Sequence, residues 1–186
     1  TGIIDRTSAP VGRESWFSSV NNRNSVPANV SIGTNGTFDP VNRLLNLNIN
    51  STALQNLSGT FKMNLIILED SLVFPQTGNT SCPGGSQYIH NNVVRAMING
   101  ADGELLNNGS TWNIGETISK NIQYTVPANF VIGKCNLVVL VYKVQSPFYQ
   151  SQIQQAVRFS FTNLSQLSIT VTSPNGGENI LGGSNY

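Results

Sequence analysis

The stretch Asn64-Leu-Ile-Ile-Leu-Glu-Asp-Ser71 belongs to the most informative part of this chain. Apolar residues alternate as they lead into it, and then apolar side chains fill consecutive positions, which is typical of a strand buried on both faces. The strand runs into an acidic pair, and a Gly/Pro/Ser loop follows. A second strand is predicted from Tyr88 to Ile98, and it carries the only histidine of the chain, His90, and then Arg95. The pattern predicts a strand–loop–strand unit with polar residues fixed at one end of a sandwich.

The same period of two recurs along most of the chain. Leu45, Leu47 and Ile49 alternate with asparagines at 46, 48 and 50, which predicts a strand with one wet face. Turn signals such as Asn-Gly and Asp-Gly separate the apolar runs at fairly regular intervals. The pattern predicts an all-β protein, an antiparallel two-sheet β-sandwich of the Ig/fibronectin-like kind.

Composition narrows the functional classes. The chain has 186 residues, of which 39% are hydrophobic and only 10% charged, with a formal net charge of +1. A typical domain has about 25% charged residues, and here asparagine, serine and threonine take the polar role. The near-zero charge gives no reason to expect nucleic acid as a partner. The sequence contains no apolar run long enough for a transmembrane helix. An extracellular or cell-surface setting is expected.

The chain is expected to contain three parts. Residues 1–26 are predicted to form a short strand and a helix over about 12–21, because Trp16, Phe17 and Val20 lie at helical spacing. Residues 27–166 are the predicted sandwich. Residues 167–186 are interpreted as a linker and the first strand of a further module.

A set of motifs gives the chain a family resemblance. The run Leu65-Ile-Ile-Leu-Glu-Asp70, then Gln76, then Tyr88-Ile-His-Asn-Asn-Val-Val-Arg95 resembles the Omp28-related outer membrane proteins of Bacteroidota. The resemblance implies surface exposure and an adhesin or receptor role. It also makes residues 1–26 similar to the end of a thioredoxin-like domain, although no Cys-x-x-Cys is present here. The tail Val171-Thr-Ser-Pro-Asn-Gly-Gly-Glu178 resembles the opening of Ig-like modules.

The acidic pair has two interpretations. Glu69 and Asp70 face Arg95 if the two strands pair in register, so an ion pair that locks the base of the loop is favoured. The alternative is a calcium site completed by loop carbonyl groups. His90 is either a ligand-binding or pH-responsive group or, as favoured, a half-buried side chain bonded to Glu69, Asp70 or a carbonyl group. Gln76 joins this set of structural or ligand-binding candidates through the resemblance.

Catalysis and cofactors are not expected. One histidine cannot complete a zinc set, and no Ser-His-Asp or Cys-His arrangement can be recognised from the spacing. The chain is therefore interpreted as non-enzymatic, with no metal or cofactor.

Cys82 and Cys135 are candidates for a structural disulfide, with two unpaired thiols as the alternative. Asp70-Ser71-Leu72 matches the O-glycosylation motif of exported Bacteroidota proteins, which makes Ser71 a candidate for modification.

Three functional hypotheses follow. The leading one is a surface-exposed or secreted β-sandwich module for adhesion, ligand binding or spacing, with loops 71–87, 99–113 and 145–153 presented to a protein or glycan partner. The second is a subunit of an extracellular fibre, in which the ends 1–6 and 167–172 complete the sheet of a neighbouring copy. The third is an accessory domain of a thioredoxin-like oxidoreductase.

Overall fold

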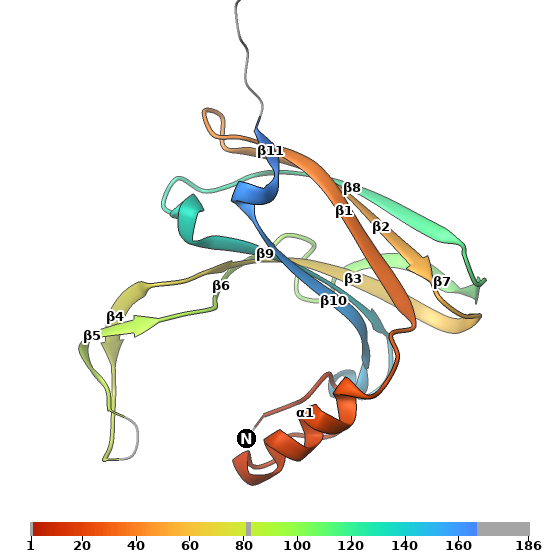
Figure 1. Ribbon diagram of the computed structural model, residues 1–186, viewed down its shortest axis with the longest axis horizontal. Helices are drawn as coiled ribbons and strands as arrows, with labels where there is room; N and C mark the ends of the chain where they lie inside the picture. The colour runs from red at the N-terminus through yellow and green to blue at the C-terminus, as the bar shows by residue number, and fades with distance from the viewer. Residues whose placement is uncertain (1, 81–82, 167–186) are drawn as a thin grey trace, which may run out of the picture.

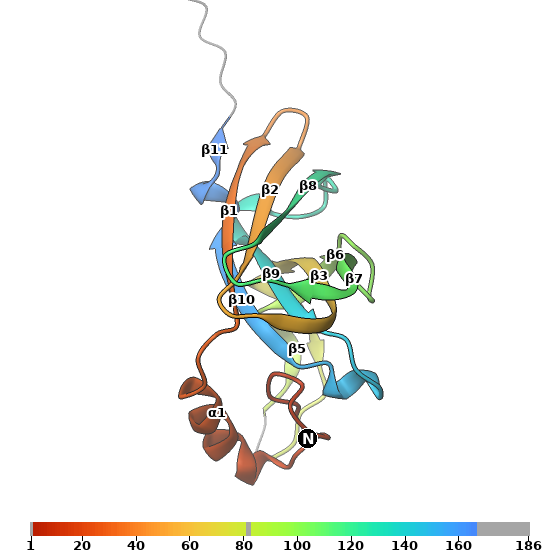
Figure 2. The same cartoon turned by 90° about the vertical axis from the view of Figure 1, so that its right-hand side faces the viewer.

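Two antiparallel sheets packed face to face form the body of the protein. The computed structural model describes residues 2–80 and 83–166. Figures 1 and 2 show the two sheets crossing over one another, with a two-stranded ribbon that extends from the second sheet and a short helix that leads into the first. The predicted all-β sandwich with a short N-terminal helix is confirmed.

The first sheet has four strands in the order β11-β1-β2-β8. Its long members are β1 (Val30–Asp39), β2 (Leu44–Ala53) and β8 (Thr117–Thr125). The register places Asn48 of β2 between Asn35 of β1 and Asn121 of β8. The short β11 (Ser165–Gln166) adds to β1 in parallel, the one exception to antiparallel pairing in the described residues.

The second sheet has β3 (Leu57–Glu69) at its centre. One edge of β3 pairs with β9 (Cys135–Lys143), which in turn pairs with β10 (Ile153–Ser160). The other edge is shared by β6 (Val93–Met97) and β7 (Glu104–Trp112), each covering half of the long strand. The loop between them is held to β3, since Asn64 Nδ2 donates to Gly100 O (2.8 Å) and Asn99 Oδ1 accepts from Leu65 N (2.8 Å).

The core lies between the two sheets. Leu45, Leu47 and Ile49 of β2 are almost completely buried, as the alternation predicts, and they belong to the same cluster as Leu65 and Val139 of the facing sheet. Two edge-to-face aromatic pairs close the ends of this layer, Phe38 with Phe161 (5.1 Å between ring centroids) and Phe61 with Trp112 (5.5 Å). The 3₁₀ turns Ile132–Lys134, Phe148–Gln150 and Phe161–Asn163 lie in connections.

A β-ribbon projects from the end of β3 and β6. It consists of β4 (Leu72–Gln76) and β5 (Gly85–His90), and we call these two strands the arm. Figure 1 shows the arm turned away from the sheets. The predicted continuous strand from Tyr88 to Ile98 is wrong, because the chain bends at Asn91 and at Asn92, whose φ is 55°. The expected loops 71–87 and 99–113 likewise contain strands, the arm and β7.

The N-terminal segment packs against the second sheet through polar contacts. Its 3₁₀ turn (Arg13–Ser15) and α1 (Trp16–Asn24) begin and end later than the predicted helix. Phe17 is 79% exposed, so its helical spacing does not mark a buried face. Asp5 O accepts from Ile153 N (3.0 Å), and the Asp5 carboxylate pairs with Arg23 (3.0 Å). The Arg6 guanidinium lies 4.5 Å from the Phe148 ring centroid. The predicted tail module, residues 167–186, lies outside the described residues.

Candidate functional site

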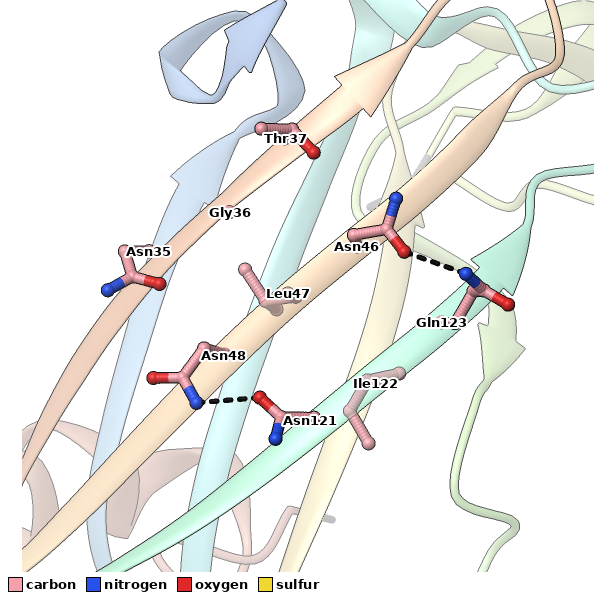
Figure 3. A pocket seen from close by; sticks show the side chains of 9 residues that line it. All are labelled: Asn35, Gly36, Thr37, Asn46, Leu47, Asn48, Asn121, Ile122 and Gln123. Atoms are coloured by element: carbon pink, nitrogen blue, oxygen red, sulfur yellow. Dashed lines mark hydrogen bonds between the residues drawn. The ribbon is translucent and has the colours of Figure 1, made fainter. Parts of the chain in front are cut away.

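A ladder of amide side chains crosses the outward face of the first sheet. Figure 3 shows Asn46 bonded to Gln123 and Asn48 bonded to Asn121, at 2.9 and 2.8 Å between the amide nitrogen and oxygen atoms. Asn48 Oδ1 also accepts from Asn50 Nδ2 (2.7 Å). The strand period of two explains the ladder, since the apolar residues of β2 point into the core and its asparagines point out.

The ladder is part of a larger uncharged surface that we call the amide face. It comprises outward residues of three strands: Ser31, Gly33, Asn35 and Thr37 of β1; Asn46, Asn48, Asn50 and Thr52 of β2; and Thr117, Ser119, Asn121, Gln123 and Thr125 of β8. Asp39 and Leu44, in the last row of the sheet beside Thr125, lie outside this set. Every side chain in this set is an amide, a hydroxyl or a hydrogen. Across the strands, Ser119 Oγ donates to Asn50 Oδ1 (2.6 Å), and the hydroxyls of Thr52 and Thr117 are 2.7 Å apart. The face therefore offers hydrogen-bonding groups without charge.

The amide face is hollowed between β1 and β8. A groove of about 490 Å³ is lined by Asn35, Thr37, Asn46, Asn48, Asn121 and their neighbours. Glycine at position 36 allows β1 to approach β2, because a Cβ there would lie 2.2 Å from Asn46 O. A second hollow of about 560 Å³ lies beyond the edge of β8, where Asn121 and Gln123 meet Asn99 and Glu104. Asn121 and Gln123 line both hollows, so the polar surface continues round the edge of the sheet.

Three of the residues singled out from the sequence, Glu69, Asp70 and Arg95, lie at a different place, the base of the arm. Glu69 is completely buried, and its carboxylate is held by Arg95 and by Val131 N, which donates to Oε1 (3.0 Å). Arg95 in turn lies over the Phe130 ring, 4.3 Å from its centroid. Both carboxylate oxygens of Glu69 are thus occupied by the protein's own donors, which favours the structural interpretation over a calcium site.

Asp70 pairs with a residue that sequence reasoning did not single out. Its Oδ2 accepts from Arg158 Nη2 (3.1 Å) and from Asn136 Nδ2 (3.3 Å), and its Oδ1 accepts from Asn92 N (2.7 Å). Arg158 Nη1 donates to Asn92 Oδ1 (2.7 Å). These bonds hold the bend at which the arm leaves the sheet. The only sequence signal for Arg158 was its polar position in an alternating strand.

His90 and Gln76 lie on the arm itself. The His90 ring stacks edge-to-face on Tyr88 (4.9 Å), and its Nε2 lies 3.3 Å from Phe74 O. Gln76 ends β4 opposite Gly85. Of the partners expected for His90, the structure shows the carbonyl group of Phe74, and no bond to Glu69 or Asp70 occurs among the described residues. His90 and Arg95 line one groove beside the bend. Whether these five candidates bind a ligand stays a prediction.

Cys135 is buried and lies close to the Glu69 carboxylate. Burial, and then the charge of Glu69, raises the pKa of the Cys135 thiol to about 11. Cys135 is a free thiol in the structure. Its proposed partner Cys82 lies outside the described residues, so the disulfide stays a prediction.

Ser71, the candidate for glycosylation, is exposed at the bend with φ 60°, and its N–H donates to Asn91 Oδ1 (2.9 Å).

Comparison with known protein families shows to which family this chain belongs. Residues 1–158 match the family described as outer membrane protein Omp28. The chain belongs to the Omp28 family. Membership confirms the predicted resemblance and agrees with the expected extracellular or outer-membrane location. No helix in the described part of the chain is both long and apolar enough to cross a membrane. The comparison with curated proteins gives no significant match.

One solved structure shares the fold of this member of the Omp28 family at low sequence identity. The structure of HBP35 of Porphyromonas gingivalis matches with a TM-score of 0.60 at 12% identity, over 86% of this chain and 50% of that one. The chain therefore spans about half the length of HBP35. A domain of the outer membrane lipoprotein Omp28 from Porphyromonas gingivalis matches at 18% identity with a TM-score of 0.46, over 77% of this chain and 95% of that one.

Proposed function

We propose that this Omp28 protein is a non-enzymatic binding module of the cell surface whose amide face holds neutral glycan chains. The observation that carries the proposal is the hydrogen-bonded ladder of Asn46, Asn48, Asn121 and Gln123 beside a groove of about 490 Å³. A sugar hydroxyl both donates and accepts, and so does a primary amide. A row of amides is therefore matched to a ligand that presents hydroxyls at short intervals.

The absence of charge on the amide face favours neutral glycans over acidic ones. An acidic polysaccharide would find no cation on the amide face with which to pair, and burying its carboxylates there would cost free energy. A neutral chain has no such cost. The chemistry therefore favours neutral hexose polymers over uronic acid or sulfated polymers.

The bonds within the ladder hold it in place for a ligand. Ordering a free side chain on binding costs about 0.5–1.5 kcal/mol of conformational entropy. An amide that is already fixed by a neighbouring side chain loses less entropy when a ligand binds. The ladder also leaves capacity for a ligand, because a primary amide has two N–H donors and an oxygen with two lone pairs. Weak affinity for a single chain, and avidity for surfaces that carry many chains, are expected.

Affinity measurements test the proposal directly. Calorimetry with cellohexaose, laminarihexaose and mannohexaose is expected to give binding to at least one of them, and none to oligogalacturonate of equal length. Asn121→Lys and Asn48→Lys are expected to weaken that binding on the order of tenfold, because a charge in the groove must lose water when the neutral ligand binds. Asn22→Lys adds the same charge on the exposed surface of α1 and is the matched control.

Two outcomes contradict the proposal. One is a protein that binds none of the neutral oligosaccharides at millimolar concentration. The other is binding that Asn22→Lys weakens as much as Asn121→Lys does.

The alternative roles stay predictions. A fibre built by strand addition needs free strand-like ends, and residues 2–6 are instead fixed to the same chain by the Asp5 and Arg6 contacts. The other proposed end, 167–172, lies outside the described residues. An accessory role to an oxidoreductase depends on parts beyond this sequence, and no contact among the described residues favours it.

A further inference from the structure

We propose that the arm is a self-association element that pairs with the arm of a second copy of this chain. The arm is a two-stranded sheet, and no third strand pairs with β4 or β5 in the described residues. The outer edges of both strands thus present backbone N–H and C=O groups that sheet pairing would satisfy.

Both faces of the arm are apolar. Val73 and Ile89 lie opposite each other on one face and are 49% and 57% exposed. Phe74, which is 61% exposed, and Tyr88 form a pair on the other face. An isolated two-stranded ribbon is only marginally stable in water. A ribbon that exposes apolar side chains on both sides gains stability when further strands extend it and neighbouring side chains cover it.

Charge favours a second copy as the partner. From Ser71 to Val94 the chain contains no Asp, Glu, Lys or Arg. Two identical surfaces that meet about a two-fold axis place like groups close together, so any charge near the axis would repel its own copy. The neutral arm escapes this repulsion. It also lacks the charged residues that commonly protect exposed strand edges, although it has Pro75 and an irregularity of the pairing between Phe74 and Gln76.

Membrane insertion is disfavoured by the same strand edges. Unpaired N–H and C=O groups each cost several kcal/mol in hydrocarbon, so open strand edges are not found there. A strand from another chain satisfies these groups, whereas lipid does not.

The base of the arm holds it ready for pairing. Asp70, Asn92 and Arg158 fix the bend through the bonds at 2.7–3.1 Å described above. Beside the bend, a groove of about 650 Å³ is lined by Leu72, Phe74, Pro75, His90, Val93, Val94, Arg95 and Asn129. This groove has room for side chains from a partner's arm, so that strand pairing and apolar burial occur together.

Charge-swap variants test the inference. Sedimentation equilibrium of the whole chain is expected to show a reversible dimer. Val73→Lys and Ile89→Lys are each expected to weaken it at least about tenfold, because like charges are brought together. An equimolar mixture of Val73→Lys and Val73→Glu chains is expected to recover the dimer as a heterodimer. Val41→Lys is the control, since Val41 is 87% exposed on the turn between β1 and β2.

The outcomes separate the alternatives. Circular dichroism and melting temperature are measured for every variant, so that loss of folding is recognised. A wild-type chain that stays monomeric at high micromolar concentration overturns the inference, as does a dimer that the arm variants leave unchanged. Flotation of a monomeric wild type with phosphatidylcholine vesicles, lost in Val73→Lys, also overturns it and points to lipid instead.

Discussion

At the residue scale, two acidic neighbours have very different surroundings. Glu69 is completely buried with Arg95, which is 18% exposed, whereas Asp70 pairs with Arg158 at the surface. Removing one partner of a buried pair leaves an uncompensated charge in the protein interior. Exposed pairs are screened by water and contribute little. The same kind of substitution should therefore have unequal effects at the two sites.

We predict that Arg95→Met lowers the free energy of unfolding by about 3 kcal/mol, because it leaves the Glu69 carboxylate buried without its cation. Arg158→Met, the matched control, should cost about 1 kcal/mol or less. Urea denaturation of both variants measures the difference. Equal losses at the two sites would show that Glu69 is not held by a buried ion pair.

The Cys135 thiol gives a pH-dependent prediction. With a pKa of about 11, on the order of one thiol in a thousand is ionised at pH 8. In a Cys82→Ser protein, Cys135 should react with a thiol reagent far more slowly than in the same protein unfolded in guanidinium chloride. The raised pKa also stabilises the fold below about pH 8.5, and this contribution is lost as the pH rises toward 11. Equal reaction rates in the folded and unfolded protein would contradict this account.

The cysteine pair is tested separately. If Cys82 bonds Cys135, reduction raises the mass of the intact protein by that of two hydrogens. Mass spectrometry of the protein before and after reduction detects this difference. The buried free thiol at Cys135 predicts that the two masses are equal. A mass difference would establish the disulfide instead.

The outward position of the β2 asparagines in the amide face could be predicted from the sequence alone. The asparagines of β2 were expected on a wet face because their apolar neighbours alternate with them, and the structure places them there. The partnership of Asp70 with Arg158 was not predicted, since the two residues are far apart in sequence. A single sequence does not reveal which side chains meet when distant strands become neighbours.

At the element scale, glycine at one position of β1 allows the first sheet to form. A Cβ at Gly36 would lie 2.2 Å from Asn46 O and 3.0 Å from Leu47 Cα, both of them backbone atoms. A Cβ at Gly33 would meet nothing closer than 4.0 Å. The two glycines on the same strand thus differ in what they tolerate.

We predict that Gly36→Ala destabilises the protein by about 2 kcal/mol, because backbone atoms of β1 and β2 must move apart. Gly33→Ala should change stability by no more than about 0.5 kcal/mol or stabilise slightly, since it only restricts the unfolded chain. Thermal unfolding of both variants measures this contrast. A Gly36→Ala protein as stable as the wild type would contradict the close approach of the two strands.

The type of each element was easier to predict than its ends. The period of two identified β2 and β3 because one or both of their faces are buried. The break between β5 and β6 could not be read from it, because the bend depends on Asn92 at φ 55° and on its bonds to Asp70 and Arg158. The apolar residues of α1 also misled, since Phe17 faces solvent.

At the scale of the whole molecule, the two sheets differ in what they present. The first sheet buries one face in the core and turns the amide face outward. The second sheet continues into the arm (Figure 1) and contacts the N-terminal segment at Ile153. The amide face and the arm are separate surfaces, so the proposed glycan binding and the proposed pairing with a second copy would not compete.

Chemical-shift mapping identifies the surface of the protein that a bound glycan contacts. The ¹H–¹⁵N spectrum of the labelled chain is titrated with whichever neutral hexasaccharide binds in calorimetry. We predict that the amide signals that shift belong to outward residues of β1, β2 and β8, including the side-chain amides of Asn48, Asn121 and Gln123. Shifts confined to the arm or to the base of the arm, or none at saturating ligand, would contradict this prediction.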